Sequence, residues 1–101
     1  MPHFCVHAFD QPGRLADRQR LRDGHRVRLR QHDHPVAVHI GGPLLDEAGQ
    51  MIGTMLVIEA ESRAAVEAYL AGDPYMLEDL FATISITGFK WGLGQPEPIH
   101  G

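Results

Sequence analysis

The sequence predicts an α+β fold in which the helices lie on one face of an antiparallel sheet. Apolar residues alternate with polar ones in several short segments, as in strands, and recur every three or four residues in others, as in helices. In chain order these segments read β-α-β-β-α-α-β, a split β-α-β pattern. The 101 residues suit one domain, and a hydrophobic content of 44% is ordinary for a globular chain.

The first predicted strand covers residues 3–9, and turn residues separate it from a long helix. In this helix Leu21, His25 and Leu29 recur every four residues, so they share one face. Gly24 lowers the helix propensity by about 1 kcal/mol relative to alanine. Because it has no side chain, we expect it to leave room beside His25 for another group to approach.

A hairpin follows once a proline has ended the helix. We expect its first strand over residues 36–40, a break at 41–43 and a continuation at 44–45. Residues 46–50 are polar turn residues, and the apolar run 51–60 is the second strand of the hairpin.

Two helices and a last strand complete the predicted fold. Ser62 caps the first of these helices, and a short helix runs from Pro74 to about Phe81. Asp73 precedes a proline that suits a first helical turn, which is typical of an N-cap. Residues 83–91 alternate again and form the last strand.

The face of the predicted sheet that carries no helices is apolar and has to be buried against another surface. We expect it to carry Cys5, Phe9, Met55, Val57, Phe89 and Trp91. This set is too apolar to remain in water, so we expect a second copy of the chain to cover it and form a homodimer.

Charge and cysteine content exclude several classes of protein. The net charge is −4, and the clustered arginines of the first helix are spread around it with aspartates between them. We therefore expect no nucleic-acid binding and interpret most of the arginines as a solvated face, while an anionic ligand stays open. Cys5 is the only cysteine, and no segment has the pattern of a signal peptide or a membrane span, so we expect a cytoplasmic protein that binds no membrane. Residues 95–101 read as a loose tail to a single domain over 1–101.

The chain resembles the YciI-like (YCII-related) family, whose domain is a ferredoxin-like fold of the dimeric α/β barrel type. The matching positions are His25 and Leu29, residues 42–44, Gly49 and Gly53, residues 62–68, residues 73–75, and residues 89–91. They occur in the family's order over nearly the whole chain. The resemblance implies a small enzyme or enzyme-like protein with a histidine and aspartate pair, which here corresponds to His25 and Asp73. Residues 32–35 depart from the commoner family pattern at the rim of the expected pocket.

His25 and Asp73 are the predicted catalytic residues. A carboxylate that holds one nitrogen of an imidazole ring fixes its tautomer and makes the other nitrogen a usable base near neutral pH. Purely structural roles stay open as alternatives: His25 as a core histidine with one hydrogen bond, and Asp73 as a residue that only caps a helix.

We expect the substrate-binding groups around this pair, in a pocket bounded by the first helix, the second strand and the Pro74 helix. Arg22 lies one turn before His25 and could supply positive charge. Backbone amides near Gly42 and Pro43, or at the start of the Pro74 helix, could hold an anionic oxygen. Tyr75 is expected in the core or the pocket wall.

Two histidine groups raise the question of a metal. They are His32 with His34 beside Asp33, and His3 with Cys5 and His7 on one face of a strand. Neither has the spacing of a closed zinc site, so we expect no metal and no cofactor.

The predicted function is cofactor-independent proton transfer by His25 on a small polar or aromatic molecule, of the lyase, isomerase or hydrolase type. The alternative is a non-catalytic dimeric module that binds or senses a small ligand with the same pocket. The polar pair and the glycine-rich wall are compatible with both.

Overall fold

A computed structural model of the chain describes residues 1–96. It contains four strands and three helices: β1 (His3–Asp10), α1 (Leu15–Leu29), β2 (Ala37–Leu45), β3 (Met51–Glu59), α2 (Arg63–Ala71), α3 (Pro74–Leu77) and β4 (Phe81–Phe89). The predicted order of elements is confirmed. Of the predicted loose tail, residues 97–101 lie outside the described part of the chain.

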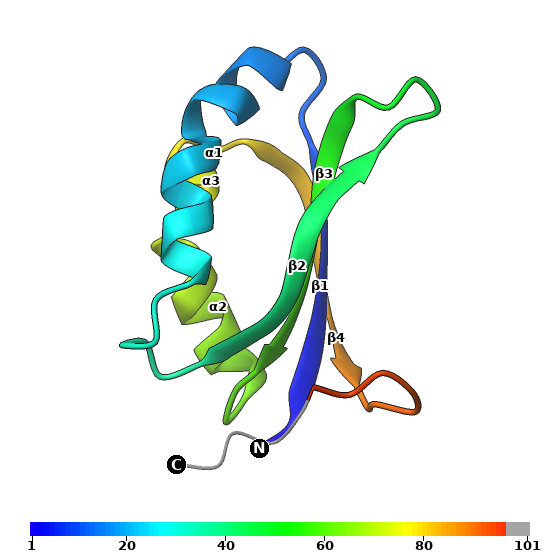
Figure 1. The fold of residues 1–101 in the computed structure, drawn as a ribbon. Helices are drawn as coiled ribbons and strands as arrows, with labels where there is room; N and C mark the ends of the chain where they lie inside the picture. Colours follow the sequence, from blue (N-terminus) through cyan, green and yellow to red (C-terminus); the bar gives the residue numbers. More distant parts are fainter. Residues whose placement is uncertain (97–101) are drawn as a thin grey trace.

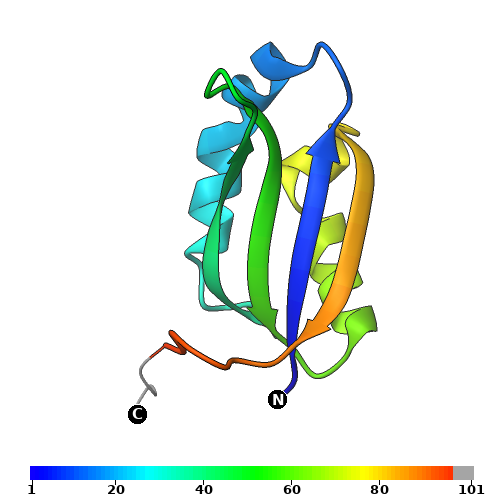
Figure 2. The ribbon, with the colours of Figure 1, turned by 90° about the vertical axis from the view of Figure 1, so that its right-hand side faces the viewer.

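The four strands form one antiparallel sheet in the order β2-β3-β1-β4. All three helices pack on one side of it, and no helix or strand among residues 1–96 covers the other side (Figure 1). Viewed from the uncovered side, β1 and β3 run through the middle of the sheet, with the helices behind them (Figure 2). This is the ferredoxin-like α+β fold that the sequence predicts.

The core lies between the sheet and the helices. Alternate residues of the strands point toward it, so that Val6, Leu56, Ile58 and Ile86 pack against Val66 and Leu70 of α2. Ser62 caps α2 as predicted, because its Oγ accepts a hydrogen bond from the backbone N–H of Ala65 at 3.1 Å.

The predicted break at residues 41–43 is wrong, since β2 continues through them to Leu45. Gly41, Gly42 and Pro43 pair in register with residues of β3. A proline is tolerated here because β2 is an edge strand of the sheet. The interruption takes the form of two irregularities in register, between Val38 and Ile40 and between Leu44 and Leu45.

The predicted boundary between the last helix and the last strand is also wrong. Helix α3 ends at Leu77, and Asp79 adopts the left-handed conformation with φ 53°. The backbone N–H of Leu80 donates to the carbonyl of Tyr75 at 2.9 Å, which turns the chain back toward the sheet. Strand β4 therefore begins at Phe81, and Trp91 lies beyond its end.

Among residues 1–96, the helices are too short or too polar to cross a membrane.

Candidate active site

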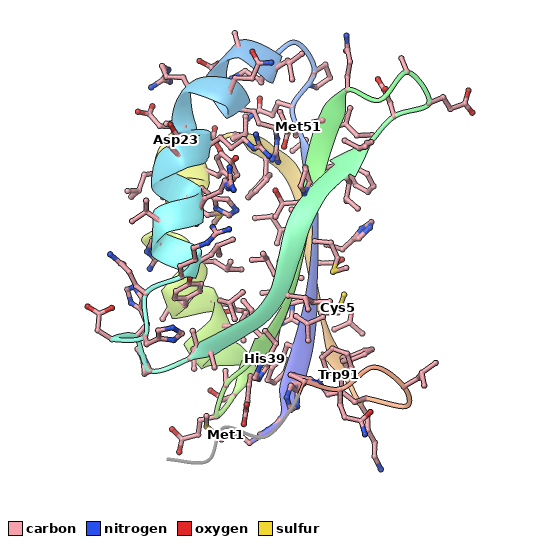
Figure 3. All side chains as sticks on the ribbon, viewed as in Figure 1. Met1, Cys5, Asp23, His39, Met51 and Trp91 are labelled. Atoms are coloured by element: carbon pink, nitrogen blue, oxygen red, sulfur yellow. The ribbon has the colours of Figure 1, made fainter. Side chains whose placement is uncertain are left out.

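Helix α1 presents two polar side chains, Arg18 and His25, to the covered face of the sheet. Arg18 is 2% exposed and His25 is 7% exposed, whereas Leu21 of the predicted stripe is only half-buried. The two residues are seven positions apart, which is about two helical turns. In contrast, Asp23 lies on the side of α1 away from the sheet (Figure 3).

The predicted contact between His25 and Asp73 is present. His25 Nδ1 lies 2.7 Å from Asp73 Oδ2, and both side chains are buried. A carboxylate oxygen only accepts hydrogen bonds, so Nδ1 is the nitrogen that carries the hydrogen. In the neutral ring Nε2 is then the basic nitrogen, and it makes no hydrogen bond with any residue in the described range 1–96.

Asp73 also caps α3, so the two interpretations of this residue hold together. Its Oδ1 accepts a hydrogen bond from the backbone N–H of Tyr75 at 2.9 Å while Oδ2 faces His25. The cap fixes the carboxylate in one orientation, and that orientation directs the second oxygen at the imidazole.

Gly24 lies where α1 meets the start of α3. A Cβ atom at Gly24 would lie 3.4 Å from Cγ of Pro74, which is already van der Waals contact. The group expected to approach beside His25 is therefore Pro74, the residue that follows Asp73.

Tyr75 forms a rigid support for the histidine. Its ring stacks on the His25 ring with 4.2 Å between the centroids and 24° between the planes. The guanidinium of Arg18 also lies over the Tyr75 ring, 4.6 Å from its centroid. Burial raises the pKa of the Tyr75 phenol above its ordinary value of 10.0, and the charge of Arg18 offsets part of this effect. Tyr75 is therefore a neutral wall of the site and not a base at physiological pH.

Arg18 is held by a buried ion pair that sequence reasoning missed. Its Nε and Nη2 donate to the two carboxylate oxygens of Asp10 at 2.6 and 2.8 Å, and Nη2 also donates to Thr54 Oγ1 at 2.8 Å. The expectation that the arginines form a solvated face is wrong for this residue. Arg18 and Arg22 are four residues apart on the side of α1 that carries His25, but this spacing does not show which of the arginines is buried.

A cavity of about 210 Å³ opens beside His25. It is lined by α1, by Gly42 and Pro43 of β2 and by Tyr75 of α3, as predicted. Four arginines also line it: Arg18, Arg22, Arg26 and Arg30. Apart from Arg18, none of them forms an ion pair with a carboxylate within residues 1–96. The cavity is thus positively charged although the chain carries a net charge of −4, so it suits an anionic ligand.

The start of α3 does not supply the predicted anion-binding amides. The N–H of Tyr75 is bonded to the Asp73 side chain, and the N–H groups of Met76 and Leu77 donate to the Asp73 carbonyl at 2.9 Å each. The arginines are therefore the charged groups that face an anion in this cavity.

Among residues 1–96, the two histidine groups noted in the sequence do not converge as grouped there. His34 contacts Gln31 and Asp33, at 3.3 and 3.9 Å, and not His32. His7 lies with its ring edge against Phe9.

The model of the YCII-related domain matches residues 2–90 of the chain. The chain belongs to this family. Among curated proteins, none matches it in sequence.

One solved member of this fold is an enzyme. The 5-chloro-2-hydroxyhydroquinone dehydrochlorinase from Burkholderia phenoliruptrix, in complex with 2,5-dihydroxybenzoquinone, is 28% identical to this YCII-related protein. The similarity has a TM-score of 0.77 and covers 89% of this chain and 95% of the dehydrochlorinase.

Two further solved structures share the fold at lower identity. One is a putative antibiotic biosynthesis monooxygenase from Bacteroides thetaiotaomicron, with 15% identity, a TM-score of 0.60 and coverage of 97% of this chain and 95% of the other. The second is an uncharacterized NIPSNAP domain protein from Burkholderia xenovorans, with 11% identity, a TM-score of 0.54 and coverage of 96% and 100%. At these identities the YCII-related protein shares their fold alone.

Proposed function

We propose that the protein is an enzyme in which His25 moves protons on a small hydroxylated aromatic ring, without a cofactor. The observation that carries the proposal is the His25–Asp73 hydrogen bond of 2.7 Å at the wall of an arginine-lined cavity. A buried base oriented by a carboxylate needs a substrate that loses a proton, and the arginines favour the anion that results.

Each residue has a distinct role in this proposal. Nε2 of His25 accepts and returns the proton, while Asp73 keeps the ring in the required tautomer. Arg22 is the cation one turn away from His25, and it stabilises the oxyanion that forms when a hydroxyl group loses its proton. Gly42 and Pro43 form the opposite wall, where no side chain beyond the proline ring competes for space. Tyr75 supports the His25 ring by stacking on one of its faces.

The similarity to a dehydrochlorinase favours elimination of a halide as the reaction. On a halogenated polyhydroxy ring, two hydroxyl protons leave oxygen and one proton is delivered to the carbon that carries the halogen. The halide departs with its bonding pair, and two carbon–oxygen bonds become carbonyls. The net loss is one proton and one halide ion, so the reaction needs neither an oxidant nor a reductant.

The cavity volume is consistent with a ring of this size. About 210 Å³ holds a single substituted benzene ring and little more, because binding cavities for drug-sized ligands start at about 300 Å³. General acid–base catalysis contributes about 10²- to 10⁴-fold, on the order of 3 to 5 kcal/mol. The remaining stabilisation would come from the arginines.

A chloride-release assay with chlorinated di- and trihydroxybenzenes tests the proposal. We expect turnover by the wild type, a loss of at least about 10²-fold in His25→Ala, and full activity in the control His32→Ala, whose side chain is exposed in a turn. Arg22→Gln should lower kcat/KM at least about 10-fold by removing the charge that faces the oxyanion. Wild-type activity in His25→Ala would contradict the proposal.

The alternative function is a non-catalytic binding module, and the same protein samples distinguish it. Saturable binding of these phenols by calorimetry, with no chloride release and no other change in their absorption spectra, would favour that alternative over an enzyme.

A further inference from the structure

Three ionisable side chains from three neighbouring strands meet on the uncovered face of the sheet. They are His3 of β1, His39 of β2 and Glu59 of β3. His3 is directly opposite Glu59 in the β1–β3 register and has the opposite orientation to Phe4, whose side chain packs on the core. His39 lies at the same end of the sheet as Met1 and Trp91 (Figure 3). The cluster is thus separate from the His25 cavity, which is on the covered face.

A β-bulge in the edge strand β2 helps to bring the His39 side chain close to His3 and Glu59. In β2, Val38 pairs with Ile58 and Ile40 pairs with Val57, so His39 is the extra residue between two consecutive ladder partners. Bulges of this kind redirect side chains and occur often beside functional sites. Here His39 Nε2 reaches Glu59 Oε1 at 2.8 Å, although the residue paired with Glu59 on β2 is Ala37.

The three donor atoms are close enough to share one ion. His3 Nε2 lies 3.8 Å from Glu59 Oε1, and all three donor atoms lie within 4.8 Å of one another. Ligand atoms at about 2.0 to 2.1 Å from a tetrahedral zinc ion are about 3.3 Å apart. Small rotations of three half-buried side chains therefore convert the present contacts into a coordination geometry.

We propose that His3, His39 and Glu59 bind one divalent transition-metal ion of the zinc type. Two imidazoles and one carboxylate are the donor set of open metal sites, in which protein supplies three ligands and leaves the remaining positions to water or another molecule. Calcium and magnesium prefer all-oxygen ligand sets, so this donor set disfavours them.

The surroundings of the cluster fit a bound cation. Glu59 Oε1 accepts a hydrogen bond from His39 Nε2 at 2.8 Å, so one carboxylate oxygen already faces an imidazole of the cluster. The amino group of Met1 approaches the other carboxylate oxygen at 3.7 Å and would have to give up this contact only if Glu59 bound the metal through both oxygens. His3 also lines a groove at this end of the sheet, together with Phe4, Lys90 and Trp91.

Titration of the chelator-treated full-length protein with Zn²⁺ at pH 7.5, followed by calorimetry, tests the proposal. We expect one ion per chain. We expect His3→Gln, His39→Gln and Glu59→Gln each to weaken binding by more than about 10-fold, since even partners outside the coordination sphere contribute about 10- to 100-fold. The matched control is His32→Gln, which removes an exposed histidine from a turn and should bind as the wild type does.

A second measurement does not depend on any variant folding. Co²⁺ bound to the wild type should show the visible absorption of a four- or five-coordinate site with nitrogen and oxygen ligands. Cys5 lies two residues from His3 in β1, so a thiolate-to-cobalt charge-transfer band would reveal a different ligand set.

Three results of the titration would overturn the proposal. They are equal Zn²⁺ affinity of Glu59→Gln and the wild type, loss of binding in His32→Gln, and a stoichiometry of one ion per two chains. The last result would place the ion between two copies and not among three ligands of one chain. A cobalt spectrum identical to that of the aqueous ion would have the same consequence.

Discussion

The two faces of the sheet hold their polar side chains in different ways. On the covered face, Arg18, Asp10, His25 and Asp73 are buried between the helices and the strands, and each makes a hydrogen bond of 2.6 to 2.8 Å. On the uncovered face, His3, His39 and Glu59 are only half-buried, and their contacts range from 2.8 to 3.8 Å.

The difference shows how burial separates fixed from adjustable polar groups. A buried charge without a partner is costly, so the covered face tolerates one arrangement, and a base can be oriented there before any ligand binds. The uncovered face leaves its side chains room to rotate, which suits groups that take up a metal ion or a second protein surface.

The largest expected effect follows removal of the buried arginine. Arg18→Met leaves the Asp10 carboxylate, 7% exposed, without its cation, and we expect the free energy of unfolding to fall by about 3 to 5 kcal/mol. Urea denaturation measures this. Arg20→Met is the matched control, since the Arg20 side chain is 56% exposed and its loss should cost less than about 1 kcal/mol. Equal effects of the two substitutions would contradict a special role of the buried pair.

The next effect concerns the apolar part of the uncovered face. We propose that a second copy of the chain covers it, because Phe9, Ile40 and Phe89 are each about two-fifths exposed there. Ile40→Asp should weaken the dimer at least about 30-fold, about 2 kcal/mol, because a carboxylate would be buried without a partner. Sedimentation over a concentration range measures this.

Val27→Asp serves as the control for the dimer. Val27 is 60% exposed on α1, away from the sheet, and a charge there should leave the association unchanged. A wild-type protein that stays monomeric at micromolar concentration would contradict the dimer itself.

Two adjacent glycines of β2, Gly41 and Gly42, differ in the space available for a side chain on the two faces of the sheet. A Cβ at Gly41 would lie 2.6 Å from Leu56 Cδ2 in the core, whereas a Cβ at Gly42 would meet nothing within 4 Å. Gly41→Ala should therefore cost about 1 to 3 kcal/mol of stability through overpacking. Gly42→Ala should leave the melting temperature nearly unchanged, and a drop as large as that of Gly41→Ala would show that the uncovered side is also closely packed.

The smallest effect is the pH dependence of the Glu59 contact. Its pKa is lowered by the hydrogen bond from His39, so the contact stabilises the folded state above the ordinary pKa of 4.5, and this stabilisation is lost as the pH falls through the lower folded value. With a chelator present, Glu59→Gln should cost less than about 1 kcal/mol at pH 7, and the difference from the wild type should vanish in acid. A difference that persists unchanged at pH 3 would exclude this linkage.

The sequence was sufficient for the order of elements, and the family resemblance together with local patterns pointed to the contact between His25 and Asp73. Both residues belong to local patterns, a helical stripe and a helix cap, and the split β-α-β order brings α1 beside α3. Local patterns also predicted that Arg22, Gly42 and Tyr75 line the cavity, and they do.

The sequence was insufficient wherever the arrangement depends on register or on depth. Seven arginines lie between residues 14 and 30, and no periodicity alone shows that Arg18 is the one whose charge is buried against Asp10. The cluster of His3, His39 and Glu59 combines three segments far apart in the chain, and it depends on strand register and on a bulge that composition does not reveal.

The tautomer of His25 decides whether this residue can act as the catalytic base, because only an unprotonated Nε2 can accept the substrate's proton. Long-range ¹H–¹⁵N NMR spectra of the imidazole distinguish the two nitrogens, and His25→Gln assigns the signal among seven histidines. In the neutral wild-type ring we expect hydrogen on Nδ1 and none on Nε2. Asn in Asp73→Asn has one oxygen, which still caps Tyr75, and its amide then donates to Nδ1, so the hydrogen should move to Nε2 while stability changes little. The same tautomer in both proteins, or hydrogen on Nε2 in the wild type, would contradict the account.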